Sequence, residues 1–154
     1  MSTPFPQLSE VHQQQIARAT LQALVQWLPG HASLSPVEIV QRLDRVVLFL
    51  QQNGSPSRQA GQVTSLAFAW GMQVQRALGW QWVNAATDGT FNPALQSEDG
   101  RLLCCAVDVV TALVMRQASG SLLKLFNELI SAQVPADAEL PHRIELAERP
   151  AVRA

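Results

Sequence analysis

The change from helix to sheet falls within residues 70–100, which read WGMQVQRALGWQWVNAATDGTFNPALQSEDG. Apolar residues recur at helical spacing up to Leu78, and Gly79 follows them as a residue type that commonly ends a helix. After Gly79 the period changes to the alternation of a β-strand, with Trp80 and Trp82 on one face. This stretch therefore predicts a chain that combines helices with a sheet.

Two Asp-Gly pairs divide the chain after Gly79 into three short strands. Asp88-Gly89 and Asp99-Gly100 tolerate the positive φ angles that hairpin turns require. Pro93 lies between the two turns and cannot donate a backbone hydrogen bond, so the second strand should be short or lie at the sheet edge. We expect a three-stranded antiparallel meander.

Three helices are predicted before the sheet. The first begins at Ser9 and stops at Pro29-Gly30. Its predicted buried face comprises Ala17, Leu21, Leu24, Val25 and Leu28. The third runs from about Pro56 to Leu78 and carries small residues that would let another helix approach closely. These residues are Ala60, Gly61, Ala67 and Gly71.

The second helix has the clearest start in the chain. Ser35 is placed as its N-cap, Pro36 stands at the first helical position, and Glu38 completes a capping box. Its apolar stripe comprises Ile39, Val40, Leu43, Val46, Val47 and Leu50. Val37 and Leu48 lie on the far side among polar residues. Two apolar faces indicate contact with two neighbours or with a partner protein.

One or two helices are predicted after the sheet. Asp108 can cap the first, although the β-branched run that follows could also form a strand. Residues 122–130 form an amphipathic helix pattern. From Pro135 onward, prolines and alternating charges accompany few large apolar residues. We therefore expect a single α+β domain over residues 1–134 and a disordered or loosely docked tail over residues 135–154.

The composition argues against nucleic-acid and membrane partners. Charged residues make up 15% of the 154 residues and the net charge is −1, so no broad field attracts phosphate backbones or anionic lipids. No apolar run approaches the ~18 residues of a transmembrane helix, and residues 1–8 do not form a secretory signal. We expect a cytoplasmic protein. Its sparsely charged helices favour docking, so we also expect a protein partner or a homo-oligomer.

The cysteines and histidines do not form a recognisable site. Cys104 and Cys105 are adjacent, so on a strand their side chains would point to opposite faces, as expected of two buried apolar residues in a reducing compartment. No helix start is predicted directly after them to stabilise a thiolate. His12, His31 and His142 are not at metal-ligand spacing. We expect neither a metal nor a cofactor.

No catalytic residue can be assigned from the sequence. The chain lacks a glycine-rich phosphate loop, a nucleotide-binding motif and a nucleophile elbow. Asp88, Glu98 and Asp99 could act as paired carboxylates, but hairpin geometry explains acidic residues at turns. We therefore do not expect an enzyme.

The tryptophans of the first strand have two interpretations. Trp80 and Trp82 either cover the core against Phe68 and Trp70 or form an exposed platform for a ligand or partner. Core packing is the favoured interpretation.

Residues 65–130 resemble a bacterial domain family of unknown function. The resemblance rests on a helix that ends in Leu-Gly, a Trp-bearing strand, acidic Gly turns and a closing helix. The matching residues are Gly71, Leu78, Gly79, Trp82, Val83, Asp88-Gly89, Pro93-Ala94-Leu95, Gly100, residues 107–114 and Gly120-Ser121-Leu122. The chain has Val107-Asp108 where the family usually has a proline, and the resemblance implies no catalytic residues. The order of elements also resembles small secretion chaperones of Gram-negative bacteria, in architecture and size alone.

The sequence leads to three ranked hypotheses for function. The first is a non-enzymatic protein-binding module, such as an immunity-type inhibitor or a secretion accessory. Its candidate contact residues are Trp80, Trp82, Val37 and Leu48. The second is a small-ligand-binding or regulatory domain with an aromatic pocket near Trp80 and Trp82. The third is an enzyme that uses Asp88, Asp99 or Cys105.

Overall fold

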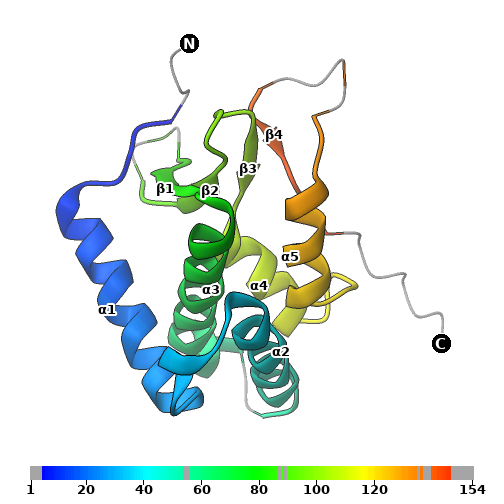
Figure 1. Cartoon of the computed structure of the whole chain (residues 1–154). Helices are drawn as coiled ribbons and strands as arrows, with labels where there is room; N and C mark the ends of the chain where they lie inside the picture. Colours follow the sequence, from blue (N-terminus) through cyan, green and yellow to red (C-terminus); the bar gives the residue numbers. More distant parts are fainter. Residues whose placement is uncertain are drawn as a thin grey trace.

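The computed structural model describes residues 5–53, 56–86, 88, 90–134, 136 and 140–146, apart from the side chains of residues 56–59. Within these residues the chain combines α-helices with a four-stranded sheet (Figure 1), which confirms the predicted α+β class. The elements are α1 (Glu10–Trp27), the 3-10 helix η1 (His31–Ser33), α2 (Pro36–Gln52), α3 (Pro56–Leu78), β1 (Gln81–Asn84), β2 (Pro93–Gln96), β3 (Leu102–Cys104), α4 (Ala106–Val114), α5 (Leu122–Ser131) and β4 (His142–Arg143).

The sheet has the strand order β1-β2-β3-β4. β1 and β3 pair antiparallel with β2, as the predicted meander requires, with Trp82 opposite Leu95 and Leu95 opposite Cys104. β4 pairs parallel with β3, with Leu102 opposite His142. The prediction of a purely antiparallel three-stranded sheet followed only by helices is therefore wrong. The sheet is mixed, and α4 and α5 lie between its third and fourth strands in the sequence.

β4 comes from the segment that the sequence predicts as a tail. The His142 N–H donates to the Arg101 carbonyl and the Ile144 N–H to the Leu103 carbonyl, both at 2.8 Å. Ile144 also packs against the core. A strand of two residues is too short to leave a periodic pattern in the sequence. The backbone hydrogen bonds that hold it do not depend on residue type. The domain boundary at residue 134 stays a prediction, and β4 lies beyond it.

Parts of the predicted turns and tail lie outside the described residues. They are Thr87 and Gly89 in the first turn and residues 135, 137–139 and 147–154 in the tail. In the first turn, the Asp88 carboxylate accepts a hydrogen bond from the Thr90 N–H at 3.1 Å. In the second, the Gly100 N–H donates to the Ser97 carbonyl at 2.9 Å, and Gly100 has a φ of 74°. The second turn is therefore confirmed with the glycine geometry that the sequence predicts.

The outer edge of β1 is covered by the N-terminal segment. Gln7 forms an antiparallel bridge with Val83, and the Asn84 N–H donates to the Pro6 carbonyl at 3.0 Å. On the other side of the meander, β4 pairs with β3. Each flank of the meander is thus paired with a segment from a different end of the described chain.

The two faces of the sheet bury different side chains. Trp82 and Cys104 belong to the main core, whereas Val83, Leu103 and Cys105 belong to a smaller cluster on the other face. Both thiols are free and buried. The opposite placement of the adjacent cysteines is therefore as predicted.

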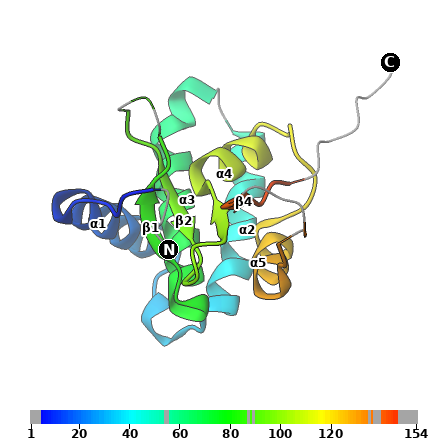
Figure 2. The same cartoon turned by 90° about the horizontal axis from the view of Figure 1, so that it is seen from above.

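α3 is the central helix of the fold. It contacts α1, α2, α4 and α5, and Figures 1 and 2 place α1 at the outer edge of the molecule. Trp70 of α3 is fully buried and donates its indole N–H to the Leu122 carbonyl at 3.3 Å. Gly79 has a φ of 74° and follows the last residue of the helix, as predicted.

The predicted starts of α1 and α2 are confirmed. The Ser9 hydroxyl accepts from the His12 N–H at 3.2 Å. The Ser35 hydroxyl accepts from the Glu38 N–H at 3.3 Å, and the Glu38 carboxylate accepts from the Ser35 N–H at 3.4 Å. These bonds satisfy N–H groups that have no partner within their own helix.

The buried side of α1 differs from the predicted face. Leu24 is buried as predicted, but Leu21 and Val25 are 57% and 58% exposed. Ile16 and Thr20 lie on the buried side instead. The helix is rotated relative to the prediction because it lies at the edge of the molecule, where α3 is its main neighbour. One side of α1 therefore keeps apolar side chains exposed.

The close approach at Gly71 involves the sheet and not another helix, so the predicted neighbour is wrong at this position. A Cβ atom added at Gly71 would lie 2.7 Å from Cη2 of Trp82 and 3.3 Å from Cδ1 of Leu95. A Cβ added at Gly61, on the same helix, would meet no atom within 4 Å. Gly71 therefore makes room for the indole ring of β1.

The N-terminus of α5 is held by a residue of α2. The Asp44 carboxylate accepts hydrogen bonds from the Leu122 N–H at 2.7 Å and the Leu123 N–H at 3.1 Å. The Ser121 hydroxyl accepts from the Lys124 N–H at 3.0 Å. Side chains thus satisfy the first three N–H groups of α5. Burial raises the pKa of Asp44, and the two backbone hydrogen bonds oppose that increase.

Candidate functional site

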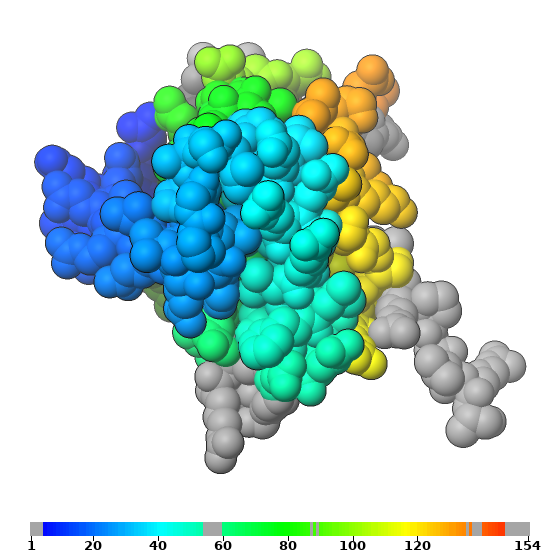
Figure 3. Space-filling view, turned by 60° about the horizontal axis from the view of Figure 1, so that its bottom comes forward, coloured from blue at the N-terminus to red at the C-terminus, as the bar shows by residue number. Residues whose placement is uncertain are grey.

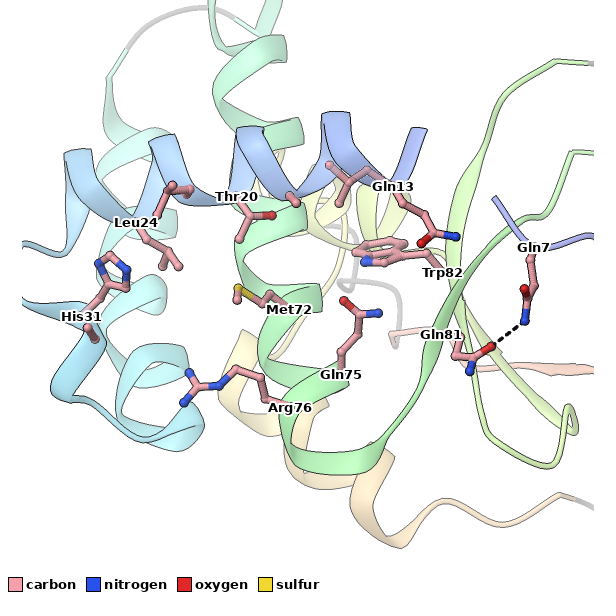
Figure 4. A pocket seen from close by; sticks show the side chains of 14 residues that line it. Gln7, Gln13, Thr20, Leu24, His31, Met72, Gln75, Arg76, Gln81 and Trp82 are labelled. Carbon is pink, nitrogen blue, oxygen red and sulfur yellow. Dashed lines mark hydrogen bonds between the residues drawn. The ribbon is translucent and has the colours of Figure 1, made fainter. Parts of the chain in front are cut away.

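A cavity of about 610 Å³ lies between α1, α3 and β1, and we call it the α1–α3 groove (Figure 4). Its apolar floor includes Ile16 and Leu24 of α1 and Trp82 of β1, all of which are buried. Leu21 and Met72 also line it, and their side chains are 57% and 39% exposed. The groove therefore combines a buried apolar floor with apolar side chains that solvent can reach.

Polar side chains line the groove at its two ends and also between them, where Figure 4 shows Thr20 and Gln75. At one end, the Gln7 amide donates to the Gln81 side-chain oxygen at 2.9 Å. At the other end lie His31 and Arg76, whose guanidinium donates to the side-chain oxygen of the fully buried Gln73 at 2.8 Å. The described residues that line the groove include no Asp or Glu. A group that presents an apolar side to Ile16, Leu24 and Trp82 and a carboxylate to Arg76 would fit this arrangement.

Trp80 and Trp82, the first pair of predicted contact residues, are buried. Each is 6% exposed, and the Trp82 ring meets the Phe68 ring edge to face with 5.6 Å between centroids. The alternative of an exposed platform is therefore wrong, and the core interpretation is confirmed. Trp82 additionally lines the α1–α3 groove, whereas Trp80 does not. A role for either in binding stays a prediction.

Val37 and Leu48, the second pair, are 41% and 56% exposed on α2. Neither lines the α1–α3 groove, so the structure does not join them to Trp82 in one site. Polar residues near them on this helix contact other elements: Asp44 binds the start of α5, and the Gln51 amide donates to the Leu113 carbonyl at 2.8 Å. The second face of α2 thus contacts α4 and α5 of the same chain, and it also carries exposed apolar side chains.

The acidic residues of the turns hold their own turns. The Asp99 carboxylate accepts from the Ser97 hydroxyl at 2.6 Å and the Arg101 N–H at 3.0 Å, and these bonds lower its pKa. Hydrogen bonds from the side chain and backbone of Thr90 likewise lower the pKa of Asp88. Neither carboxylate lines the α1–α3 groove. Turn geometry, the favoured interpretation of these residues, accounts for both.

Cys105 occupies the N-cap position of α4, so the expectation that no helix starts after the cysteines is wrong. Burial nevertheless raises the pKa of the Cys105 thiol; Arg143 opposes this increase, and Asp108 adds to it. Burial also raises the pKa of Cys104 to about 12. Since the thiolate is the nucleophile, a raised pKa leaves both cysteines weakly reactive at neutral pH.

We expect neither thiol of the folded protein to react with 5,5′-dithiobis(2-nitrobenzoic acid) at pH 7, because both are buried and protonated. Unfolding in guanidinium should release both cysteines of the chain to the reagent. The absorbance of the released thionitrobenzoate measures the number of reactive thiols. A fast-reacting thiol in the folded state that disappears in Cys105→Ser would contradict this prediction and favour the enzyme hypothesis.

Other kinds of site have no support in the described residues. They contain no group of three or more His, Cys, Asp or Glu side chains that could hold a metal ion. No helix in the described part of the chain is long and apolar enough to cross a membrane.

Comparisons with models of protein families, with curated proteins and with solved structures find no match. The resemblance of residues 65–130 to a bacterial domain family therefore stays a hypothesis.

Sequence reasoning identified Trp82 as a candidate but missed the rest of the groove. The helical pattern predicts Leu21 in the core, and Met72 and Arg76 belong to no motif. The sequence of α1 gives one indication of an exposed surface. Its apolar residues, among them Ile16, Leu21 and Val25, are more numerous than a single contact with α3 can bury. Such a surplus indicates an exposed apolar surface but does not reveal a cavity.

Proposed function

We propose that the protein is a non-enzymatic protein-binding module whose α1–α3 groove takes an apolar segment of a partner that carries a carboxylate. The observation that supports it is the combination of the exposed Leu21 and Met72 with the buried apolar floor of the groove. Exposed apolar side chains around a hollow are typical of protein interaction sites. Arg76 at one end, with no acidic residue among the described lining, favours a carboxylate over a cation there.

Within this proposal the protein keeps the class expected from the sequence, an immunity-type inhibitor or a secretion accessory in the cytoplasm. Two free cysteines are usual in that compartment. A homo-oligomer would be a second copy seated in the same groove. Val37 and Leu48 would form a separate contact on α2, because they lie outside the groove.

The groove is tested by Leu21→Ser combined with Met72→Ser, with Val11→Ser as the matched control. Val11 is 62% exposed on the same helix and does not line the groove. A partner is first identified as a protein that copurifies from the native host with both the wild type and the control. We expect this partner to bind the groove variant at least about tenfold more weakly than the wild type, as is usual when side chains at the centre of an interface are removed. Affinity for the recombinant partner is measured by calorimetry. Equal binding by all three proteins would overturn the proposed site.

A small ligand is the second candidate function, because a cavity of about 610 Å³ falls in the usual size range of ligand pockets. Trp82 in its wall provides the readout. Tryptophan fluorescence is titrated with a panel of aliphatic and aromatic carboxylates, in wild type and in Trp82→Phe. A saturable change that requires Trp82 would favour this candidate, and its absence with every compound would remove it.

A further inference from the structure

A second hollow, of about 580 Å³, lies where the C-terminal end of α1 meets α2 and α3. We call it the α1–α2 cleft. Figure 3 shows the C-terminal part of α1 and the length of α2 side by side on one face of the molecule. The cleft and the α1–α3 groove share no lining residue. The cleft is therefore a distinct feature of the surface.

Aromatic and aliphatic side chains form the apolar part of the cleft. Phe49 is 56% exposed, Trp27 and Val46 are half-buried, and Leu28 is buried. Exposed apolar side chains that gather around a hollow are typical of protein interaction sites. Aromatic residues are also enriched at the centres of protein interfaces.

Two arginines give the cleft its charge. Arg42 and Arg45 are exposed and three residues apart on α2, so they are neighbours on the helix surface. No Asp or Glu is among the described residues that line the cleft. A guanidinium matches a carboxylate through two parallel hydrogen bonds, and arginine is a preferred residue in interface ion pairs. Arg42 and Arg45 are the only charged side chains among the described residues that line the cleft, and Glu38 lies one turn before Arg42 on the same helix.

We propose that the α1–α2 cleft binds an acidic protein segment in which an apolar side chain lies between two carboxylates. The carboxylates pair with Arg42 and Arg45, and the apolar side chain packs between Trp27 and Phe49. Charge complementarity selects the acidic segment, and the exposed aromatic side chains select its apolar residue. This site is independent of the α1–α3 groove, so it extends the proposed function to a second contact.

The probe is an array of twelve-residue peptides in Gly-Ser backgrounds that carry two Asp residues and one Phe at varied spacing. Each peptide has a counterpart with Lys in place of Asp and another with Ser in place of Phe. We expect the best Asp-Phe peptide, measured by fluorescence anisotropy, to bind at least about tenfold more tightly than either counterpart. Its affinity should fall as salt rises, because exposed charges are screened.

Variants then assign the binding to the cleft. We expect Arg42→Gln, Arg45→Gln and Phe49→Ser each to weaken the best peptide by about tenfold. Arg18→Gln is the control, because Arg18 is an exposed arginine that lines neither hollow. The Leu21→Ser, Met72→Ser groove variant should bind the peptide like wild type, so a failure of the groove proposal and a failure of the cleft proposal give different results.

Three outcomes would overturn the proposal. One is that no Asp-Phe peptide binds more tightly than its Lys counterpart. Another is that the cleft variants and Arg18→Gln behave alike. The third is that free 4-phenylbutyrate saturates the cleft while no peptide binds, which would identify a small aromatic carboxylate as the occupant. Circular dichroism of each surface variant excludes loss of folding as the cause.

Discussion

Gly71→Ala should lower the free energy of unfolding by about 1–3 kcal/mol, the usual cost of overpacking a core. The added methyl group would lie 2.7 Å from Cη2 of the buried Trp82, a distance that a carbon pair does not tolerate without a shift. Trp82 cannot move freely, because its ring also packs against Phe68. Unfolding by guanidinium, followed by circular dichroism, measures the change.

Gly61→Ala on the same helix is the matched control. Its new Cβ would meet nothing within 4 Å, so only the higher helix propensity of alanine remains. That gain is up to about 1 kcal/mol, in the stabilising direction. A Trp82→Phe background should reduce the cost of Gly71→Ala, since a smaller ring leaves room for the methyl group. Equal effects at both glycines would contradict the tight contact at Gly71.

Asp44→Ala is expected to lower the free energy of unfolding by about 2–4 kcal/mol, which combines the loss of a helix cap with unsatisfied N–H groups. The Leu122 and Leu123 N–H groups lose their acceptor, and water does not readily replace it at Leu122, which is fully buried. Asp108→Ala is the control. Asp108 lies exposed in the first turn of α4, so its removal should cost less than about 1 kcal/mol.

The contribution of Asp44 to the stability of the protein should depend on pH. Burial raises the pKa of Asp44 above 3.8 in the folded protein, so the folded state binds this proton more tightly than the unfolded state does. The stability that the group contributes is then largest below pH 3.8 and declines as the pH rises through the raised pKa. Asp44→Asn cannot titrate. The difference in unfolding free energy between wild type and Asp44→Asn should therefore fall over this window, and a rise would mean that the hydrogen bonds outweigh burial.

Local patterns in the sequence predicted the parts of the fold that local physics determines. Ser9 and Ser35 identified the starts of two helices, because a cap involves residues only three apart. The alternation after Gly79 identified β1 and the burial of Trp82. These features depend on neighbours along the chain, so one sequence suffices to find them.

Long-range contacts were not predictable in the same way. In the sequence, Asp44 is one of several polar residues on the far side of α2, and nothing near it indicates a partner. Its hydrogen-bond partner Leu122 lies 78 residues away. The rotation of α1, which exposes Leu21, depends on α1 lying at the edge of the molecule. The α1–α3 groove brings together residues from α1, α3 and β1, none of which forms a motif with the others. A cavity of this kind becomes visible only once the helices are placed in space.

The pairing of the sheet flanks has a consequence for synthesis on the ribosome. The partner of β1, around Gln7, is made before the sheet, whereas β4 is made after every other described strand. Until residue 143 has left the exit tunnel, β3 presents an unpaired edge in the nascent chain, and such edges recruit other chains. A chain that ends before His142 therefore leaves the outer edge of β3 without its partner strand, whereas β4 covers this edge once it has been made.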